Sequence, residues 1–244
     1  MQRNRLVIAT VGALLLCCSS EPSNSSGVPA AADISAVITH FGGDGVYIIN
    51  VAEERVVANF DADTVDEPAA GFTGHSGDWR VVSDATAPSK PQVLAQLAKS
   101  EGSIFNVALV DEGSFRDVDV SVQLRSITGR IDQGGGLVWR ALDAQNYYIA
   151  RYNPLEDNYR VYYVKDGRRV QIQSANLSVD QETWHSLRVT MSGEHIQCFL
   201  NGTKYLDVKD STFVESGRLG LWTKADAQTH FDNLTVVEAP ASSS

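Results

Sequence analysis

Short runs of alternating apolar and polar residues recur through most of the chain. A period of two residues is typical of strands that turn one face to a core. Gly, Asp, Asn or Pro bounds each run, as expected at strand ends. The predicted strands are residues 107–110, 118–124, 137–140, 147–152, 159–164, 185–191 and 196–200. Residues 93–99 fit a helix or a strand equally well.

Two dipeptides mark tight hairpins. Asp166-Gly167 and Asn201-Gly202 follow predicted strands, and their central positions tolerate positive φ. Many short strands with almost no helical pattern predict an all-β fold, a two-sheet antiparallel β-sandwich of the jelly-roll type.

An additional N-terminal β element is expected before this sandwich. Residues 46–51 and 55–60 flank an acidic turn at Glu53-Glu54, and a hairpin is the simplest interpretation. We therefore assign residues 33–57 to the additional element and residues 58–238 to the sandwich.

The N-terminus is typical of an export signal. Arg3 and Arg5 precede an apolar run from Leu6 to Leu16, which is too short to cross a bilayer. We predict a signal peptide over residues 1–18, a flexible linker over 19–32 and a tail over 239–244. The expected location is the periplasm, the cell envelope or the medium.

Cys17 and Cys18 resemble a bacterial lipoprotein box, and both lipidation and simple cleavage stay open. A lipidated cysteine would be the sole membrane tether. Cys198, the remaining cysteine, lies in an apolar run and is expected to be a small buried hydrophobe. The formal net charge of −10 disfavours nucleic acid as a partner, and we expect a monomer.

Aromatic and basic residues gather on strands that are otherwise apolar. Because side chains alternate between faces, Tyr147, Ile149 and Arg151 share one face. A buried arginine without a partner is costly, so this face is expected to be wet or to hold an ion pair. A wet face would stack a sugar ring and donate hydrogen bonds to its hydroxyls. The predicted saccharide-binding residues are Arg140, Tyr147, Arg151, Trp222, Lys224 and Asp226.

A structural role for the same residues is the alternative. Trp139, Trp184 and Trp222 would then be core aromatics. The arginines would pair with carboxylates such as Asp143, Glu156 or Asp157.

A structural calcium ion is a further expectation. Asp61 and Asp63 stand at the start of the sandwich and Asp232 in its last strand, so the chain ends would bring hard oxygen ligands together. Alternatively, these residues form turns or carry surface charge. The histidines show no His-x-His or His-x-x-x-His spacing of the kind that binds zinc.

The order of several motifs resembles a concanavalin A-like, laminin-G-like jelly roll, and in particular the exported bacterial domains grouped with the 3-keto-disaccharide hydrolases. The motifs are Gly134 to Arg140, Asn146-Tyr147-Tyr148, Trp184 to Val189, the Asn-Gly turn, Gly220 to Asp226 and Phe231 to Leu234. The resemblance covers roughly residues 58–238. It implies the fold more specifically than the function, because this fold hosts lectins, hydrolases and adhesion modules.

Glycosidases of this fold carry two glutamates spaced Glu-x-Asp-x-x-Glu, which this sequence lacks. We therefore predict an exported domain that binds an oligo- or polysaccharide without cleaving it. One alternative is a glycoside hydrolase-like enzyme, which would need Asp117, Asp119, Asp143 or Asp226 in one groove. The other is a laminin-G-like module that binds protein through a loop edge.

Overall fold

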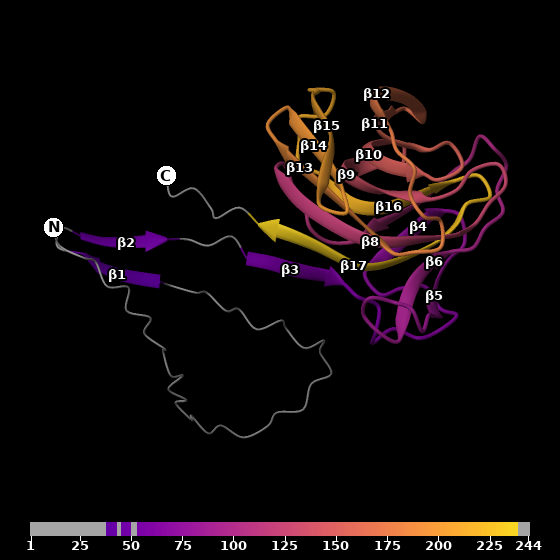
Figure 1. Ribbon diagram of the computed structural model, residues 1–244, viewed down its shortest axis with the longest axis horizontal. Coiled ribbons are helices and arrows are strands. Elements are labelled where there is room, and N and C mark those ends of the chain that lie inside the picture. The colour runs from indigo at the N-terminus through magenta and orange to yellow at the C-terminus, as the bar shows by residue number, and fades with distance from the viewer. Residues whose placement is uncertain (1–37, 43–44, 50–52, 239–244) are drawn as a thin grey trace, which may run out of the picture. The chain divides into compact units, whose positions relative to one another are not determined.

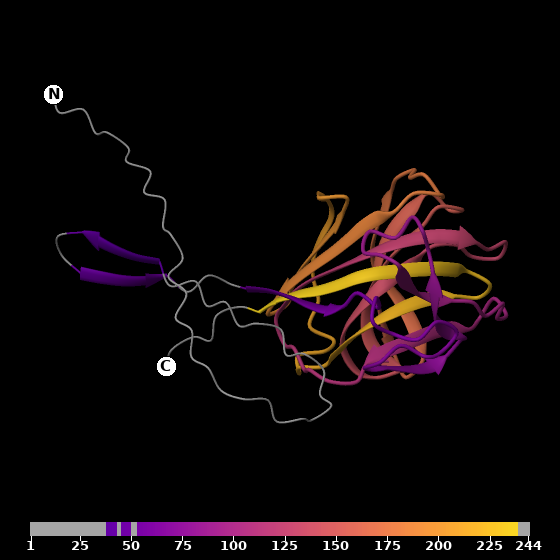
Figure 2. The ribbon, with the colours of Figure 1, turned by 90° about the horizontal axis from the view of Figure 1, so that it is seen from below.

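The computed structural model describes residues 38–42, 45–49 and 53–238, and no helix occurs among them. The described strands form two large sheets and one hairpin, and every pairing is antiparallel. The predicted two-sheet antiparallel β-sandwich is thus confirmed. Figure 1 labels most of these strands, and Figure 2 shows the same ribbon from below.

The seven-stranded sheet carries the candidate site. Its strands, in spatial order, are β12 (Arg168–Asn176), β11 (Asn158–Lys165), β10 (Asn146–Asn153), β9 (Gly135–Asp143), β16 (Arg218–Lys224), β7 (Phe105–Val110) and β4 (Phe72–Ser76).

The eight-stranded sheet packs against it. Its order is β15 (Thr203–Lys209), β14 (His195–Leu200), β13 (His185–Ser192), β8 (Val118–Thr128), β17 (Gln228–Glu238), β6 (Gln92–Gln96) and β5 (Trp79–Ser83), with β3 (Glu53–Ala58) paired to β17. The ambiguous stretch at residues 93–99 therefore contains a strand, β6.

The main core fills the space between the two sheets. Trp139 and Tyr148 of the seven-stranded sheet are fully buried and stack with ring centroids 5.5 Å apart. The Trp139 indole N–H donates across the core to the sulfur of Met191, at 3.1 Å. Cys198 is also buried here, and burial raises the pKa of its thiol. The expected role of Cys198 as a small buried hydrophobe agrees with this environment.

Both predicted tight turns are confirmed. Asp166 and Gly167 join β11 to β12 with φ of 50° and 73°, and Asn201 and Gly202 join β14 to β15 with φ of 50° and 78°. Positive φ at two successive positions gives the twist that two-residue hairpins need.

The predicted hairpin between residues 46–51 and 55–60 is wrong. β1 (Ile38–Gly42) pairs with β2 (Gly45–Ile49), whereas β3 pairs with the last strand, β17. The pairing of β17 with β6 covers only Thr229 to Phe231, so the later half of β17 offers an open edge that β3 closes. The boundary expected at residue 58 consequently falls within β3.

The signal peptide, the linker and the tail predicted from the sequence lie outside the described residues, as do Cys17 and Cys18. The described part of the chain contains no helix with the length and hydropathy that a membrane crossing requires.

Candidate functional site

The seven-stranded sheet has a second apolar cluster on the face that points away from the eight-stranded sheet. We call this face the outer face. Its buried members come only from the seven-stranded sheet and include Tyr147, Ile149, Tyr162 and Trp222. The Trp222 indole N–H donates to the Tyr147 hydroxyl at 3.1 Å, and burial raises the pKa of that hydroxyl. The seven-stranded sheet therefore carries aromatic side chains on the face opposite the one that packs against the eight-stranded sheet.

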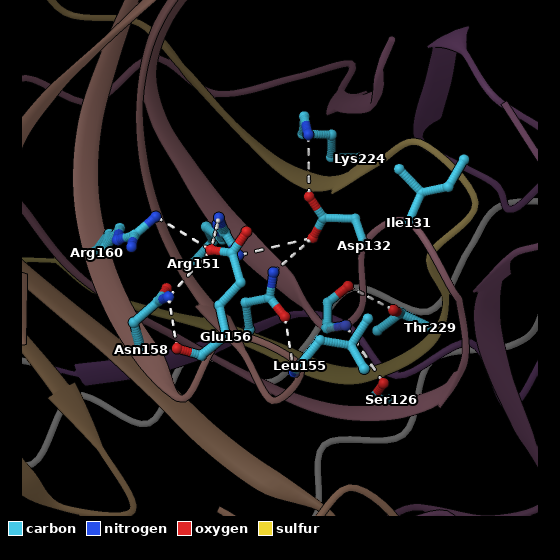
Figure 3. Close-up of polar contacts among 12 residues, drawn as sticks. Ser126, Ile131, Asp132, Arg151, Leu155, Glu156, Asn158, Arg160, Lys224 and Thr229 are labelled. Atoms are coloured by element: carbon cyan, nitrogen blue, oxygen red, sulfur yellow. Dashed lines mark hydrogen bonds and ion pairs between the residues drawn. The ribbon is translucent and has the colours of Figure 1, made fainter. Parts of the chain in front are cut away.

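Charged side chains stand beside these rings on the same face. We define the ionic cluster as Asp132, Arg151, Glu156, Arg160, Arg169 and Lys224. Arg151 lies at its centre and is only 1% exposed. Its guanidinium contacts Asp132 at 3.6 Å and Glu156 at 3.2 Å. Figure 3 shows the two carboxylates approaching Arg151 from different directions.

The other members extend the cluster toward solvent. Lys224 contacts Asp132 at 3.2 Å, and Arg160 contacts Glu156 at 3.1 Å (Figure 3). Lys224, Arg160 and Glu156 are 20%, 30% and 45% exposed, while Asp132 is 2% exposed. A ligand approaching from solvent would therefore meet these three side chains first.

Glu156 is held in its ionised form. Burial raises the pKa of its carboxyl, but a hydrogen bond from Asn158 and the charges of Arg151 and Arg160 outweigh burial and lower the pKa below its ordinary value. The amide of Asn158 donates to Glu156 at 3.0 Å. At neutral pH this side chain therefore accepts hydrogen bonds and does not donate them.

Several polar atoms around Arg151 have no hydrogen-bond partner among the described residues. They are Nε and Nη1 of Arg151, Nη1 of Arg169 and Oδ1 of Asn158. Buried donors without acceptors are costly, so such groups in a folded protein call for an explanation. Their common position on one sheet face suggests a site built to receive hydrogen-bonding groups from a ligand.

Arg169, on β12 at the edge of the sheet, covers the aromatic rings. Its guanidinium lies 4.4 Å from the ring centroid of Tyr162, 5.3 Å from Phe105 and 5.6 Å from Trp222. Contacts of this kind contribute roughly 0.5–2 kcal/mol each, depending on solvation. The Trp222 ring is 1% exposed under this cover.

The loop before β9 positions Asp132. The Asp226 carboxylate accepts the backbone N–H groups of Arg130, Ile131 and Asp132, at 2.9, 2.9 and 3.0 Å. The Asp132 carboxylate in turn accepts from the Asn153 amide at 2.9 Å, in addition to its contacts with Lys224 and Arg151. Asp226 thus fixes the loop that carries the buried carboxylate.

A glycine makes room for Arg151. Gly136 on β9 is the register partner of Arg151, and a Cβ at Gly136 would lie 2.8 Å from the Cβ of Arg151 and 2.5 Å from the carbonyl oxygen of Ala150. Any side chain at this position would push β10 away and displace the arginine.

The family model of the 3-keto-alpha-glucoside-1,2-lyase-like domain matches residues 60–237. The chain belongs to this family. The expected resemblance to the 3-keto-disaccharide hydrolase group is confirmed. No curated protein matches the chain in sequence.

Solved structures share the fold of this lyase-like domain. The carbohydrate-binding module CBM66 from Bacillus subtilis is 22% identical, with a TM-score of 0.58 over 69% of this chain and 96% of that chain. A GH43 protein from Bacillus licheniformis is 12% identical, with a TM-score of 0.52 over 74% of this chain and 39% of that chain. At these identities the likeness establishes the fold.

The lyase-like domain brings together four of the six saccharide-binding residues predicted from the sequence. Tyr147, Arg151, Trp222 and Lys224 all lie on the outer face. The expected alternation of β10 holds, because Tyr148, Ala150 and Tyr152 point into the main core instead. The open stacking surface expected of Trp222 is absent from the described structure, because Arg169 covers the ring.

Arg140 lies apart from these four, and the structure gives it a different environment. Its guanidinium donates to the backbone carbonyls of Arg116, Phe213 and Gly193 and contacts Asp117 at 3.3 Å. Arg140 also has a φ of 46°, beside the register shift between β9 and β16. The alternation of β9 breaks at this point, so counting by two from Val138 misplaces Arg140. Arg140 thus links separate loops through their backbone carbonyls. Asp226 also contacts backbone, as the acceptor of three N–H groups.

The four aspartates considered for a hydrolase are distributed over both sheets. Asp117 accepts the backbone N–H of Gly193, and Asp119 pairs with Arg188 at 2.6 Å in the eight-stranded sheet. Asp143, the last residue of β9, accepts from the Asn146 amide at the start of β10. Together with Asp226, each is engaged with neighbours in its own part of the fold.

Two of the three aspartates expected to bind calcium, Asp61 and Asp232, lie close enough for the charge of one to act on the other. Asp232 is buried and accepts from the backbone and hydroxyl of Ser89, both at 2.8 Å. Burial, and to a smaller degree the charge of Asp61, raises the pKa of Asp232. Within the described residues no three His, Cys, Asp or Glu side chains gather as a metal-binding group. Calcium at Asp61, Asp63 and Asp232 stays a prediction.

Sequence reasoning missed three members of the ionic cluster: Asp132, Arg160 and Arg169. Glu156 was expected only as a partner for an arginine, and it does contact Arg151. Arg160 had a usable signal, since it precedes Tyr162 by two residues and so shares its face. Asp132 lies in a loop, and no periodicity places a loop residue.

Proposed function

We propose that this protein is an exported carbohydrate-binding domain that holds its ligand on the outer face without cleaving it. The observation that carries the proposal is the ionic cluster beside the aromatic rings, with buried donors that lack acceptors among the described residues. Sugars offer hydroxyls for such donors and apolar ring faces for aromatic contact. The Bacillus subtilis neighbour is itself a carbohydrate-binding module, which favours a saccharide here.

The N-terminal sequence supports the export part of the proposal. A basic start and a short apolar run over residues 1–18 direct the chain out of the cytoplasm, and Cys17 or Cys18 would supply a lipid tether. The domain would then meet its saccharide in the cell envelope or outside the cell, as a monomer.

Binding without cleavage rests on the charge of Glu156 and on the contacts of Asp132. A general acid needs a proton at working pH, whereas the pKa of Glu156 is lowered. Asp132 is buried and holds Asn153, Lys224 and Arg151 at once. Glu156 therefore lacks the proton that the acid of a hydrolytic pair must donate, and Asp132 is enclosed by its three partners.

Membership of the lyase-like family favours one second candidate, an enzyme that acts on glycosides or 3-keto-glucosides. Glu156, ionised and 45% exposed, would then accept a proton from the substrate. Glu156→Gln would abolish turnover in that case. Under the binding proposal no turnover exists to lose.

The deciding experiment combines binding and turnover in the same wells. The purified protein is incubated with a panel of neutral, acidic and 3-keto oligosaccharides while thermal stability and product formation are followed. We expect a saccharide that raises the unfolding temperature and is recovered intact. A new product would replace the binding proposal with the enzyme. Neither stabilisation nor a product with any saccharide would refute both and direct attention to protein partners.

Two matched variants localise the site. Lys224→Met removes a partly exposed member of the ionic cluster and should weaken saccharide binding. Lys209→Met removes a lysine from β15 of the eight-stranded sheet, where it pairs with Glu194, and should leave binding unchanged. Equal effects of the two substitutions would place the site elsewhere.

A further inference from the structure

The ionic cluster contains more positive than negative charge. Within the described part of the chain it has four cationic side chains, Arg151, Arg160, Arg169 and Lys224, and two carboxylates, Asp132 and Glu156. The whole chain is acidic, with a net charge of −10. A basic site on an acidic protein is therefore a local feature, and general attraction to anions does not explain it.

The surplus charge coincides with unused hydrogen-bonding capacity. Arg151 is 1% exposed, yet its Nε has no hydrogen-bond acceptor among the described residues, and its Nη1 has only the Asp132 oxygen at 3.6 Å, beyond hydrogen-bond distance. Nη1 of Arg169 also has no hydrogen-bond acceptor among these residues. Leaving buried N–H groups of a guanidinium without hydrogen-bond acceptors costs free energy, and an anionic acceptor would recover it.

Arg169 is placed to exchange one partner for another. It rests on the rings of Tyr162, Phe105 and Trp222 from the edge strand β12, and its side chain is partly exposed. If the guanidinium moved off the rings toward a ligand, the aromatic surface beneath it would become available to the apolar face of a sugar. The same movement would place a charged donor beside that sugar.

We propose that the ligand of the outer face is an acidic saccharide, whose carboxylate is bound by Arg169 next to Arg151 while its ring takes the place of Arg169 on the aromatic side chains. This inference rests on the proposed function and narrows its ligand class to sugars that carry a carboxylate, such as uronic acids. A guanidinium suits this group because its paired N–H donors match the two carboxylate oxygens. The Asn158 oxygen, which has no donor among the described residues, is available to a sugar hydroxyl.

The test compares saccharides that carry a carboxylate, its neutral ester, a sulfate or no acidic group. Oligogalacturonate, its methyl ester and a sulfated galactan oligosaccharide are each titrated into the purified protein by calorimetry, with a neutral galactan oligosaccharide as reference. We expect the free acid to bind at least about tenfold more tightly than its ester, a margin that shrinks as salt is raised.

Variants assign the preference to Arg169. Arg169→Gln should bring the acid and the ester to within about threefold of each other, and Arg169→Lys, which keeps the charge but loses the paired donors, should retain part of the preference. Lys209→Gln removes one positive charge from the eight-stranded sheet and should keep the full preference. A loss of preference in Lys209→Gln as large as in Arg169→Gln would overturn the assignment.

The outcomes separate this inference from the proposed function. Equal binding of the acid, the ester and the neutral sugar would overturn the acidic ligand and leave saccharide binding intact. Binding of the sulfated sugar alone would overturn the proposal that the bound anion is a carboxylate. Failure of every saccharide in the broad panel would refute the proposed function itself, and the inference with it.

Discussion

Replacing Asp132 by Asn is expected to destabilise the fold strongly while barely changing its shape. The substitution keeps an oxygen for the Asn153 amide but removes the negative charge that faces Arg151 at 3.6 Å. Arg151 is 1% exposed and cannot turn to solvent. The buried guanidinium would therefore lose one of the two carboxylates that balance its charge.

The size of the stability loss depends on the contacts that Arg151 keeps. Removing one partner of a buried ion pair costs about 3–5 kcal/mol, because an uncompensated charge stays inside. Glu156 still contacts Arg151 at 3.2 Å, and Lys224, being 20% exposed, turns to water. We therefore expect the lower end, about 3 kcal/mol, which corresponds to a fall of about 6–12 °C in Tm for a domain of this size.

Urea unfolding of a double-mutant cycle tests the reasoning. In Arg151→Met combined with Asp132→Asn the uncompensated cation is gone, so the double variant should be no less stable than Asp132→Asn alone. Asp119→Asn is the matched control, because its partner Arg188 is 46% exposed. That surface substitution should cost less than about 1 kcal/mol.

Two results would refute this account. If the double variant lost the sum of the two single losses, Arg151 and Asp132 would not be coupled. If Asp132→Asn cost no more than Asp119→Asn, burial of the ionic cluster would have no energetic consequence.

Three further predictions concern the loop that carries Asp132, stability at acid pH and the packing of Arg169 on Trp222. Asp226→Ala removes the acceptor of three backbone N–H groups and should lower the free energy of unfolding in urea by about 2–3 kcal/mol. Hydrogen exchange should become faster in the loop that carries Asp132. Unchanged exchange there would contradict the role of Asp226. Burial raises the pKa of the Asp84 carboxyl, but hydrogen bonds from a threonine and a histidine outweigh burial and lower it to about 2. A lowered pKa contributes stability above the unfolded-state value, so up to about 2 kcal/mol should be lost as the pH falls from about 4 to about 2, and Asp84→Asn should remove this loss from the pH dependence of urea unfolding. Arg169→Ala uncovers Trp222 and should increase quenching of tryptophan fluorescence by acrylamide, whereas unchanged quenching would mean that other side chains cover the ring.

The alternation of apolar residues was sufficient to predict most of the sandwich. β7, β8, β9, β10, β11, β13 and β14 lie where the period of two placed them, and Asp-Gly and Asn-Gly gave two of the turns. Strands of this kind depend on local patterning, because one face must reach a core. The partner of β3 was not predictable in this way, since it comes from the opposite end of the chain.

The candidate site was only partly encoded in local sequence. Tyr147 and Arg151 were placed on one face by alternation alone, and the need of Arg151 for an ion pair followed from the cost of a buried charge. Asp132 is 19 residues away from Arg151 in sequence and reaches it through a loop held by Asp226. Such a contact depends on where the folded backbone brings the loop.

By itself, then, the sequence determined the fold class, the seven strands with clear alternation and the shared face of Tyr147 and Arg151, because periodicity and turn chemistry act over a few residues. The tertiary structure decided which charges meet. It turned Arg140 into a tie between loops at a break in the alternation of β9, covered Trp222 with Arg169 from the edge strand, and assembled the ionic cluster around Arg151. These contacts depend on strand order, register shifts and loop positions, which only the complete chain fixes.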